Sequence, residues 1–140
     1  MLIPSYFRDA MVQHAFEENP NECCGLLAGV QGDVLRHYRI TNTERSPYRY
    51  SMDSKELLVA MREIDDNGWE IQAFYHSHTH SPAYPSETDR RLAANWPDPF
   101  YLLISLAEQD DKGVLALNEP PVMRLFKIAD GTVVEEPIIA

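Results

Sequence analysis

Three short apolar stretches constrain the fold of this chain more than any other feature of its sequence. They are ECCGLLAGV (22–30), WEIQAFYHSH (69–78) and PFYLLISLA (99–107), and each is bounded by proline, glycine or polar residues. Apolar runs of this length are typical of buried strands, because helices that pack on a core are usually longer and repeat their apolar residues at three- and four-residue spacing. The sequence therefore predicts a largely buried β-sheet.

Two further segments have the pattern of β-hairpins. DVLRHYRI (33–40) follows the turn Gln31-Gly32 and is expected to pair with the first apolar stretch. PPVMRLFKIADGTVVEEP (120–137) contains Asp130-Gly131, a dipeptide typical of two-residue hairpin turns, and is expected to form two strands. The predicted sheet therefore has a hairpin near each end of the chain.

Helical patterns lie between these strands. Apolar residues recur at three- to four-residue spacing in 5–19 and in 53–68, which predicts a helix in each segment. Ser5 is expected to cap the first helix, and Asp53 with Glu56 three residues later resembles a capping box at the start of the second. Helices interspersed with strands indicate a mixed α/β domain built around one sheet.

Length and composition agree with one globular domain spanning residues 1–140. The 140 residues are 44% hydrophobic and 24% charged, which is far from the composition of disordered chains. No apolar run approaches the roughly 20 residues of a membrane-spanning helix, and the N-terminus lacks the basic start and long apolar stretch of a signal peptide. We therefore expect a cytoplasmic protein without a membrane partner.

The charge balance argues against nucleic acid as a partner. Twelve Lys and Arg residues oppose 22 Asp and Glu residues, which gives a formal net charge of -10. Such a surface repels phosphate backbones, and the longest basic cluster is the pair Arg90-Arg91. An acidic surface suits a neutral or basic protein partner instead. The oligomeric state stays open, with a homodimer as one option.

The two cysteines, Cys23 and Cys24, are adjacent in the sequence. Neighbouring residues rarely satisfy disulfide geometry, so no disulfide framework is expected. Reduced, buried thiols are the favoured interpretation. The alternative is a nucleophilic cysteine, which needs a base beside it that the sequence does not place.

The most informative polar segment is FYHSHTHSPAYPSETDRR (74–91). Side chains alternate across a strand, so His76 and His78 are expected on one face and Ser77 on the other. Two adjacent imidazoles at a strand end form half of a zinc site. A lone H-x-H motif is more often a pair of ordinary surface histidines, and only the residues that follow favour a metal.

Those following residues are Ser86 and Asp89, at the start of a third predicted helix of about 87–95. A serine with an acidic residue three positions later is nearly a capping box, so both residues have a purely structural explanation. The same arrangement allows Asp89 to turn back as a third metal ligand. Ser86 is then expected to hold its hydroxyl near the open position of the metal.

Three protein ligands and one open position are typical of catalytic rather than structural zinc. Two histidines and a carboxylate also suit iron(II) and other divalent ions, so zinc is inferred from ligand type. Catalysis further requires a general base that is not itself a ligand, and this residue has no local signal in the sequence.

Together, H-x-H, Ser86, Asp89 and a glutamate at the head of an apolar strand resemble the JAMM (MPN+) metalloprotease motif. NECCGLLAG (21–29) is similar to the family segment that carries the catalytic glutamate, which places that role on Glu22. The resemblance implies a curved mixed β-sheet flanked by helices, related to the cytidine-deaminase scaffold. It also implies that His76, His78 and Asp89 bind one Zn²⁺ per chain.

The resemblance also implies roles for the other two residues of the motif. Glu22 would take a proton from the attacking water and pass it to the leaving amine. Ser86 would hydrogen-bond the water or the developing oxyanion. On residue type alone, Glu22 would be an ordinary solvated carboxylate before a strand.

The chain is most similar to a bacterial branch of this family that frees cysteine from the C-terminal glycine of a ubiquitin-like sulfur-carrier protein. TNTERSPYRY, YHSHTHSPAYPSETD, FYLLISL and DGTVVEEP carry this similarity and span most of the chain. The implied partner is a carrier protein with a flexible Gly-Gly tail. Glycine is expected there because a channel narrow enough to position the tail excludes most side chains.

Two alternatives remain open. The first is a JAMM isopeptidase that removes ubiquitin-like proteins from lysines of other proteins. Ubiquitin-cleaving relatives usually carry proline where Thr79 stands, and they have insertions for which 140 residues leave little room. The second is a non-catalytic interaction module with a structural metal, whose sign would be a fourth protein ligand such as His80. Tyr84 is expected either to line the substrate channel or to pack under its loop.

Overall fold

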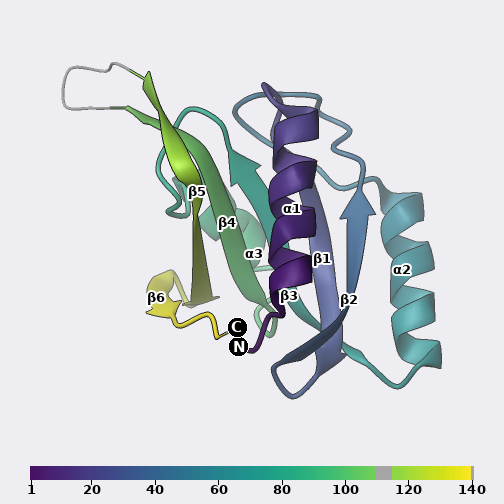
Figure 1. Cartoon of the computed structure of the whole chain (residues 1–140). Helices are drawn as coiled ribbons and strands as arrows, with labels where there is room; N and C mark the ends of the chain where they lie inside the picture. Colours follow the sequence, from purple (N-terminus) through teal and green to yellow (C-terminus); the bar gives the residue numbers. More distant parts are fainter. Residues whose placement is uncertain (110–114, 140) are drawn as a thin grey trace.

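The computed structural model describes residues 1–109 and 115–139 and confirms the mixed α/β fold in this part of the chain (Figure 1). Its elements in chain order are α1 (Ser5–Glu18), β1 (Cys24–Val30), β2 (Asp33–Ile40), α2 (Ser54–Asp66), β3 (Glu70–His78), α3 (Glu87–Ala93), β4 (Phe100–Gln109), β5 (Leu115–Ala129) and β6 (Thr132–Glu136). Among the described residues, every helix is too short or too polar to cross a membrane.

The six strands form one sheet in the order β2-β1-β3-β4-β5-β6. Strands β3 and β4 are parallel, whereas each other neighbouring pair is antiparallel. Parallel neighbours need a crossover, and α3 supplies it after β3. Polar residues at the end of β3 and at the start of α3 therefore lie near the carboxyl ends of the two parallel strands, where α/β proteins commonly bind ligands.

Both predicted hairpins are confirmed. Gln31 and Gly32 connect β1 to β2 with φ values of 49° and 87°, and Asp130 and Gly131 connect β5 to β6 with φ values of 52° and 76°. Two consecutive residues at positive φ match the right-handed twist of antiparallel strands, which explains the dipeptides found there.

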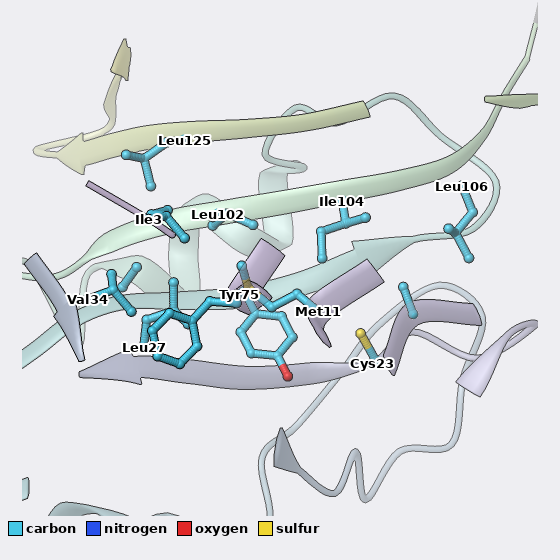
Figure 2. Packing of buried hydrophobic residues seen from close by; sticks show 13 residues of the cluster. Ile3, Met11, Cys23, Leu27, Val34, Tyr75, Leu102, Ile104, Leu106 and Leu125 are labelled. Atoms are coloured by element: carbon cyan, nitrogen blue, oxygen red, sulfur yellow. The ribbon is translucent and has the colours of Figure 1, made fainter. Parts of the chain in front are cut away.

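The helices cover opposite faces of the sheet (Figure 1). Helix α1 packs on one face over a cluster that includes Met11, Leu27 and Tyr75, which Figure 2 shows in close view. Helices α2 and α3 pack on the other face, over a cluster that includes Ile64 and Phe74. Successive residues of β3 therefore enter two separate cores, which sets the direction of its histidines.

Helix boundaries differ from the prediction in two places. Pro4 is the N-cap of α1, and no side chain caps this end, so the prediction that Ser5 is the cap was wrong. The carbonyl oxygen of Pro4 accepts the first helical N–H groups, and Ser5 is already inside the helix. Asp53 caps α2 as predicted, but Glu56 accepts a hydrogen bond from the N–H of Thr41 and does not complete the box.

Gly25 is required by close approach of two neighbouring strands to β1. A Cβ atom at this position would overlap the carbonyl oxygen of Tyr38 and the ring of Tyr75. A side chain there would displace β2 or the ring that fills the α1 core. The prediction of close backbone approach in this strand is therefore confirmed.

Candidate metal centre

The end of β3 places His76 and His78 on the face that α2 and α3 cover. Ser77 points to the opposite face, where its Oγ accepts a hydrogen bond from the N–H of Cys23 at 2.8 Å. Both imidazoles are buried, with exposed fractions of 1% and 4%. The predicted alternation is therefore confirmed, and the two imidazoles lie on one face of β3 with little access to solvent.

Asp89 lies in the first turn of α3 and belongs to a complete capping box. Ser86 Oγ accepts the N–H of Asp89 at 3.0 Å, and Asp89 Oδ2 accepts the N–H of Ser86 at 2.9 Å. This reciprocal pair fixes the start of the helix. The same Oδ2 atom lies 3.1 Å from Nε2 of His76 and 3.1 Å from Nε2 of His78. The carboxylate of Asp89 can therefore cap the helix and, with the same oxygen, face both imidazoles.

These three atoms fit a divalent ion. The two Nε2 atoms are also 3.1 Å apart, so the ligand atoms form a nearly equilateral triangle. An ion held about 2.0 Å from each atom in tetrahedral geometry separates its ligands by about 3.3 Å. Within the part of the chain that the structure describes, His76, His78 and Asp89 are the one cluster of potential metal ligands.

A hydrogen bond fixes which nitrogen of His78 faces the cluster as a lone pair. Its Nδ1 donates to the carbonyl oxygen of Pro82 at 2.7 Å, and a carbonyl only accepts. Neutral His78 is therefore protonated at Nδ1 and has a free electron pair at Nε2. Backbone carbonyls commonly orient metal-binding imidazoles in this way.

The environment also favours the ligand forms of the other two residues. Burial lowers the pKa of His76, and the ring stacks on Tyr50 with centroids 4.5 Å apart and planes 28° apart. Attraction and hydrogen bonds to the two imidazoles outweigh burial at Asp89 and hold the pKa of this carboxyl well below its usual range. Burial lowers the pKa of His78, but the hydrogen bond and the attraction to Asp89 outweigh burial and raise this pKa, so a positive charge is favoured beside the carboxylate.

Glu22 lies next to this cluster because β1 and β3 pair antiparallel. Cys24 is opposite His76, and the N–H of Ser77 donates to the carbonyl oxygen of Cys23, so the same register places Glu22 opposite His78. Its side chain is only 4% exposed. Burial, opposed by attraction to His78, raises the pKa of Glu22 to about 8.

The backbone of Glu22 is fixed by the loop that follows β2. Its N–H donates to the carbonyl oxygen of Ser46 at 2.9 Å, and its carbonyl oxygen accepts from Nδ2 of Asn42 at 3.0 Å. The amide of Asn42 also binds three backbone groups of this loop, from Glu44, Arg49 and Ser51. Sequence reasoning missed Asn42 because it is an ordinary residue of a polar loop with no local motif.

Two residues discussed from the sequence, His80 and Tyr84, are absent from the described cluster. His80 contacts Thr79 Oγ1 through Nδ1 at 2.7 Å and is absent from the described metal cluster, so the predicted sign of a structural metal is not found there. Tyr84 is 46% exposed and packs edge-on against Phe126 of β5, with ring centroids 5.4 Å apart. This placement contradicts a tyrosine packed under its loop.

The cysteines have the properties of buried, unreactive thiols. Cys23 and Cys24 are both free and buried. Burial raises the pKa of Cys23 to about 12 and raises that of Cys24 as well. A nucleophilic cysteine needs a lowered pKa, so the structure supports the prediction of reduced, buried thiols.

Comparison with known proteins agrees with the fold and the site. A family model described as prokaryotic homologs of the JAB domain (Prok-JAB) matches residues 4–118. The CysO-cysteine peptidase of Mycobacterium tuberculosis (strain ATCC 25618 / H37Rv) is 41% identical over 132 residues, which are 93% of this chain and 84% of that protein. The desampylase of Haloferax volcanii is 35% identical over 105 residues, which are 70% of this chain and 75% of that protein.

A solved structure extends the similarity to three dimensions. The solution structure of a protein from Desulfitobacterium hafniense has a TM-score of 0.82 and 39% sequence identity to this chain. The match covers 99% of this chain and 90% of that one. The chain therefore belongs to the prokaryotic JAB-domain family. The JAMM resemblance is confirmed at the level of family and fold.

Proposed function

We propose that the chain is a zinc-dependent peptidase that hydrolyses the bond after the C-terminal glycine of a ubiquitin-like sulfur-carrier protein and releases cysteine. One observation carries the proposal: three ligand atoms converge 3.1 Å apart beside a buried carboxylate. The 41% identity to a CysO-cysteine peptidase supports the substrate class. Residues 1–140 act in this proposal as one catalytic domain.

In this proposal His76, His78 and Asp89 hold one zinc ion per chain. Such an ion, when bound, polarises the scissile carbonyl, lowers the pKa of water and favours the ionised form of Glu22 through its positive charge. The protein supplies the orientation of the ligands, through the carbonyl of Pro82 and the capping box of α3. Burial of both imidazoles keeps bulk water away from the ligand atoms.

Glu22 is the proposed general base and general acid. A carboxylate oxygen of Glu22 accepts a proton from the attacking water and then donates it to the nitrogen of the departing cysteine. Support comes from its place opposite His78 and from its burial, because a general base must lie within reach of the proton that it accepts.

Ser86 is proposed to orient the water or the developing oxyanion. Its Oγ accepts the N–H of Asp89, so its own hydroxyl hydrogen is directed elsewhere. A donor aimed at developing negative charge is worth about 10²-fold or more in rate in comparable sites. The role of Ser86 is thus electrostatic, whereas that of Glu22 is proton transfer.

The decisive experiment uses a sulfur-carrier protein whose C-terminus is extended to Gly-Gly-Cys. The carrier is incubated with zinc-loaded protein, with and without a chelator, and its intact mass is followed. We expect loss of one cysteine residue that the chelator blocks. An unchanged carrier mass, with zinc demonstrably bound, would refute cysteine release from that carrier.

Cleavage of protein conjugates is the second candidate, because the desampylase of Haloferax volcanii is also a relative. A carrier joined through its C-terminus to a lysine of another protein distinguishes the two activities. If the conjugate is cleaved and the Gly-Gly-Cys carrier is not, the isopeptidase is the correct function. An interaction module with a closed metal site would cleave neither substrate.

Localisation and assembly complete the proposal. We propose that the protein acts in the cytoplasm, with no nucleic-acid or membrane partner. The net charge of -10 supports a protein substrate rather than a phosphate backbone. A homodimer is compatible with the proposal, because the three ligands and Glu22 come from one chain.

A further inference from the structure

The residue after His78, Thr79, has a polar side chain that is buried. It is 5% exposed, and its Oγ1 lies 3.1 Å from the carbonyl oxygen of Pro20, 3.1 Å from that of Pro47 and 2.7 Å from Nδ1 of His80. A single hydroxyl therefore joins the end of β3 to two segments that are distant in the sequence. The proposed mechanism above does not use this residue.

Elementary hydrogen-bond chemistry sets the direction of these contacts. Carbonyl oxygens only accept. Thr79 therefore donates its hydroxyl hydrogen either to one of the two carbonyls at a time or to both in a bifurcated hydrogen bond. The hydroxyl oxygen then accepts from His80, whose Nδ1 carries the hydrogen. The ring of His80 also packs against Tyr48, the residue after Pro47, with centroids 5.3 Å apart. The contacts of Thr79 are thus mutually consistent and specific.

Both carbonyls belong to segments that border Glu22. Pro20 lies two residues before Glu22, and Pro47 follows Ser46, whose carbonyl oxygen accepts the Glu22 N–H. Displacement of either segment would shift Glu22 relative to the end of β3. Thr79 directly follows His78, a proposed ligand. Its hydroxyl therefore connects the strand that carries the proposed ligands to the two segments that hold the backbone of Glu22.

We propose that Thr79 is a positioning residue, which fixes Glu22 at a working distance from the metal ligands through the carbonyls of Pro20 and Pro47. Its kinetic consequence rests on the proposed function. Its structural consequence, a restrained Glu22 backbone, does not. A displacement of about 1 Å at a reacting group costs on the order of 10²-fold in rate, so one buried hydroxyl suffices for a measurable effect.

The kinetic test compares Thr79→Val with Thr79→Ser. Valine keeps the shape of threonine and removes the hydroxyl, whereas serine keeps the hydroxyl and removes the methyl group. We expect kcat of Thr79→Val to fall by about 10- to 100-fold, with KM within about twofold and the bound metal unchanged. Thr79→Ser should stay within about threefold of the wild type. A residue that acts only by packing would give the reverse order.

The structural test is hydrogen exchange of the Glu22 amide, which donates to Ser46, in metal-free protein. We expect this amide to exchange at least about tenfold faster in Thr79→Val than in the wild type, because the segment around Ser46 has lost a restraint. Amides of β6, at the opposite edge of the sheet, serve as the internal control and should keep their rates.

These outcomes separate the inference from the function. If the wild type cleaves no carrier, the proposed function fails and hydrogen exchange alone decides the role of Thr79. A Thr79→Val protein that matches the wild type in kcat, or in exchange at Glu22, overturns the inference. If Thr79→Val does not fold, Thr79→Cys carries the same test, because a thiol of similar size is a weaker donor.

Discussion

Two pairs of imidazoles lie on opposite faces of strand β3. His14 of α1 and His37 of β2 contact Tyr75 on one face, and His76 and His78 of β3 contact Asp89 on the other. On the α1 face the hydroxyl of Tyr75, which Figure 2 shows within the apolar cluster, lies 2.7 Å from Nδ1 of His14 and 2.7 Å from Nε2 of His37. A phenol donates one hydrogen and also accepts, so one ring accepts from Tyr75 and the other donates to it. Burial and the positive charge of Arg39 lower the pKa of both imidazoles to about 4.

On the face of α2 and α3, a carboxylate takes the place of that hydroxyl. Asp89 brings negative charge to the two Nε2 atoms of His76 and His78 and, when ionised, has no hydrogen to donate. The α1 pair faces a neutral hydroxyl, whereas the second pair faces a carboxylate that favours a positive charge beside it. The third group, rather than the number of histidines, therefore distinguishes the candidate metal cluster from the core network.

The largest expected difference between the two faces comes from removing one imidazole from each. We expect His78→Ala to lose stoichiometric zinc and all measurable turnover, because two ligands do not hold a catalytic ion. His37→Gln on the α1 face is the matched control and should retain both. Metal content by mass spectrometry and carrier cleavage measure the effect. Loss of zinc in His37→Gln would show that the two faces are not independent.

Glu22→Gln separates proton transfer from metal binding on the second face. The amide keeps the size of the side chain but cannot accept the proton, so we expect turnover to fall by about 10³-fold. Bound zinc should stay at one per chain, because Glu22 is outside the ligand cluster. The measurement is kcat at saturating carrier, with zinc determined on the same sample. Near-full turnover would refute the general-base role.

The contribution of the α1-face imidazoles to the free energy of unfolding is expected to depend on pH. Because the pKa of His37 is lowered to about 4 from 6.5, the unfolded chain binds this proton first, and stability is lost as the pH falls from about 6.5 towards 4. Between pH 7.5 and pH 4.5, His37→Gln should lose about 2 kcal/mol less stability than the wild type. Urea unfolding of metal-free protein at the two pH values measures this difference, and equal losses would contradict it.

Tyr75→Phe tests the hydroxyl that completes the α1 network. The ring remains in the core, but His14 and His37 lose their shared partner, which should lower the free energy of unfolding by about 1–3 kcal/mol. Zinc content and kcat should stay within about twofold of the wild type, because the ring lies on the other face of β3. A large fall in kcat with normal zinc would show coupling through the strand.

Much of the fold follows from local sequence patterns. Short apolar runs, hairpin dipeptides and helical spacing predicted each element, because these signals involve residues that are close in the chain. Helix ends were less accurate: α3 ends at Ala93 rather than near 95, and Pro4 rather than Ser5 caps α1. Glu56 binds Thr41 across 15 residues, and no local rule anticipates such a partner.

In the candidate site too, local patterns predicted some residues, and contacts between distant segments determine the others. Strand alternation predicted that His76 and His78 share a face, and the capping pattern predicted the position of Asp89. Local patterns did not predict the environments of Glu22 and Thr79. Their environment depends on the pairing of β1 with β3 and on carbonyls of distant loops, which hydrophobic spacing does not encode. A family resemblance was needed for Glu22, and nothing in the sequence singled out the contacts of Thr79.

The double use of Asp89 Oδ2 also has a thermodynamic consequence. Because this atom accepts the N–H of Ser86 in the helix cap, the proposed third ligand is held in place by secondary structure, and binding an ion should remove little conformational entropy there. Proteins whose metal drives folding lose their structure when it is chelated. This chain should instead keep its circular dichroism spectrum when stripped of metal and reload without refolding. We expect a substitution at Ser86 to change the affinity for the ion without alteration of any proposed ligand.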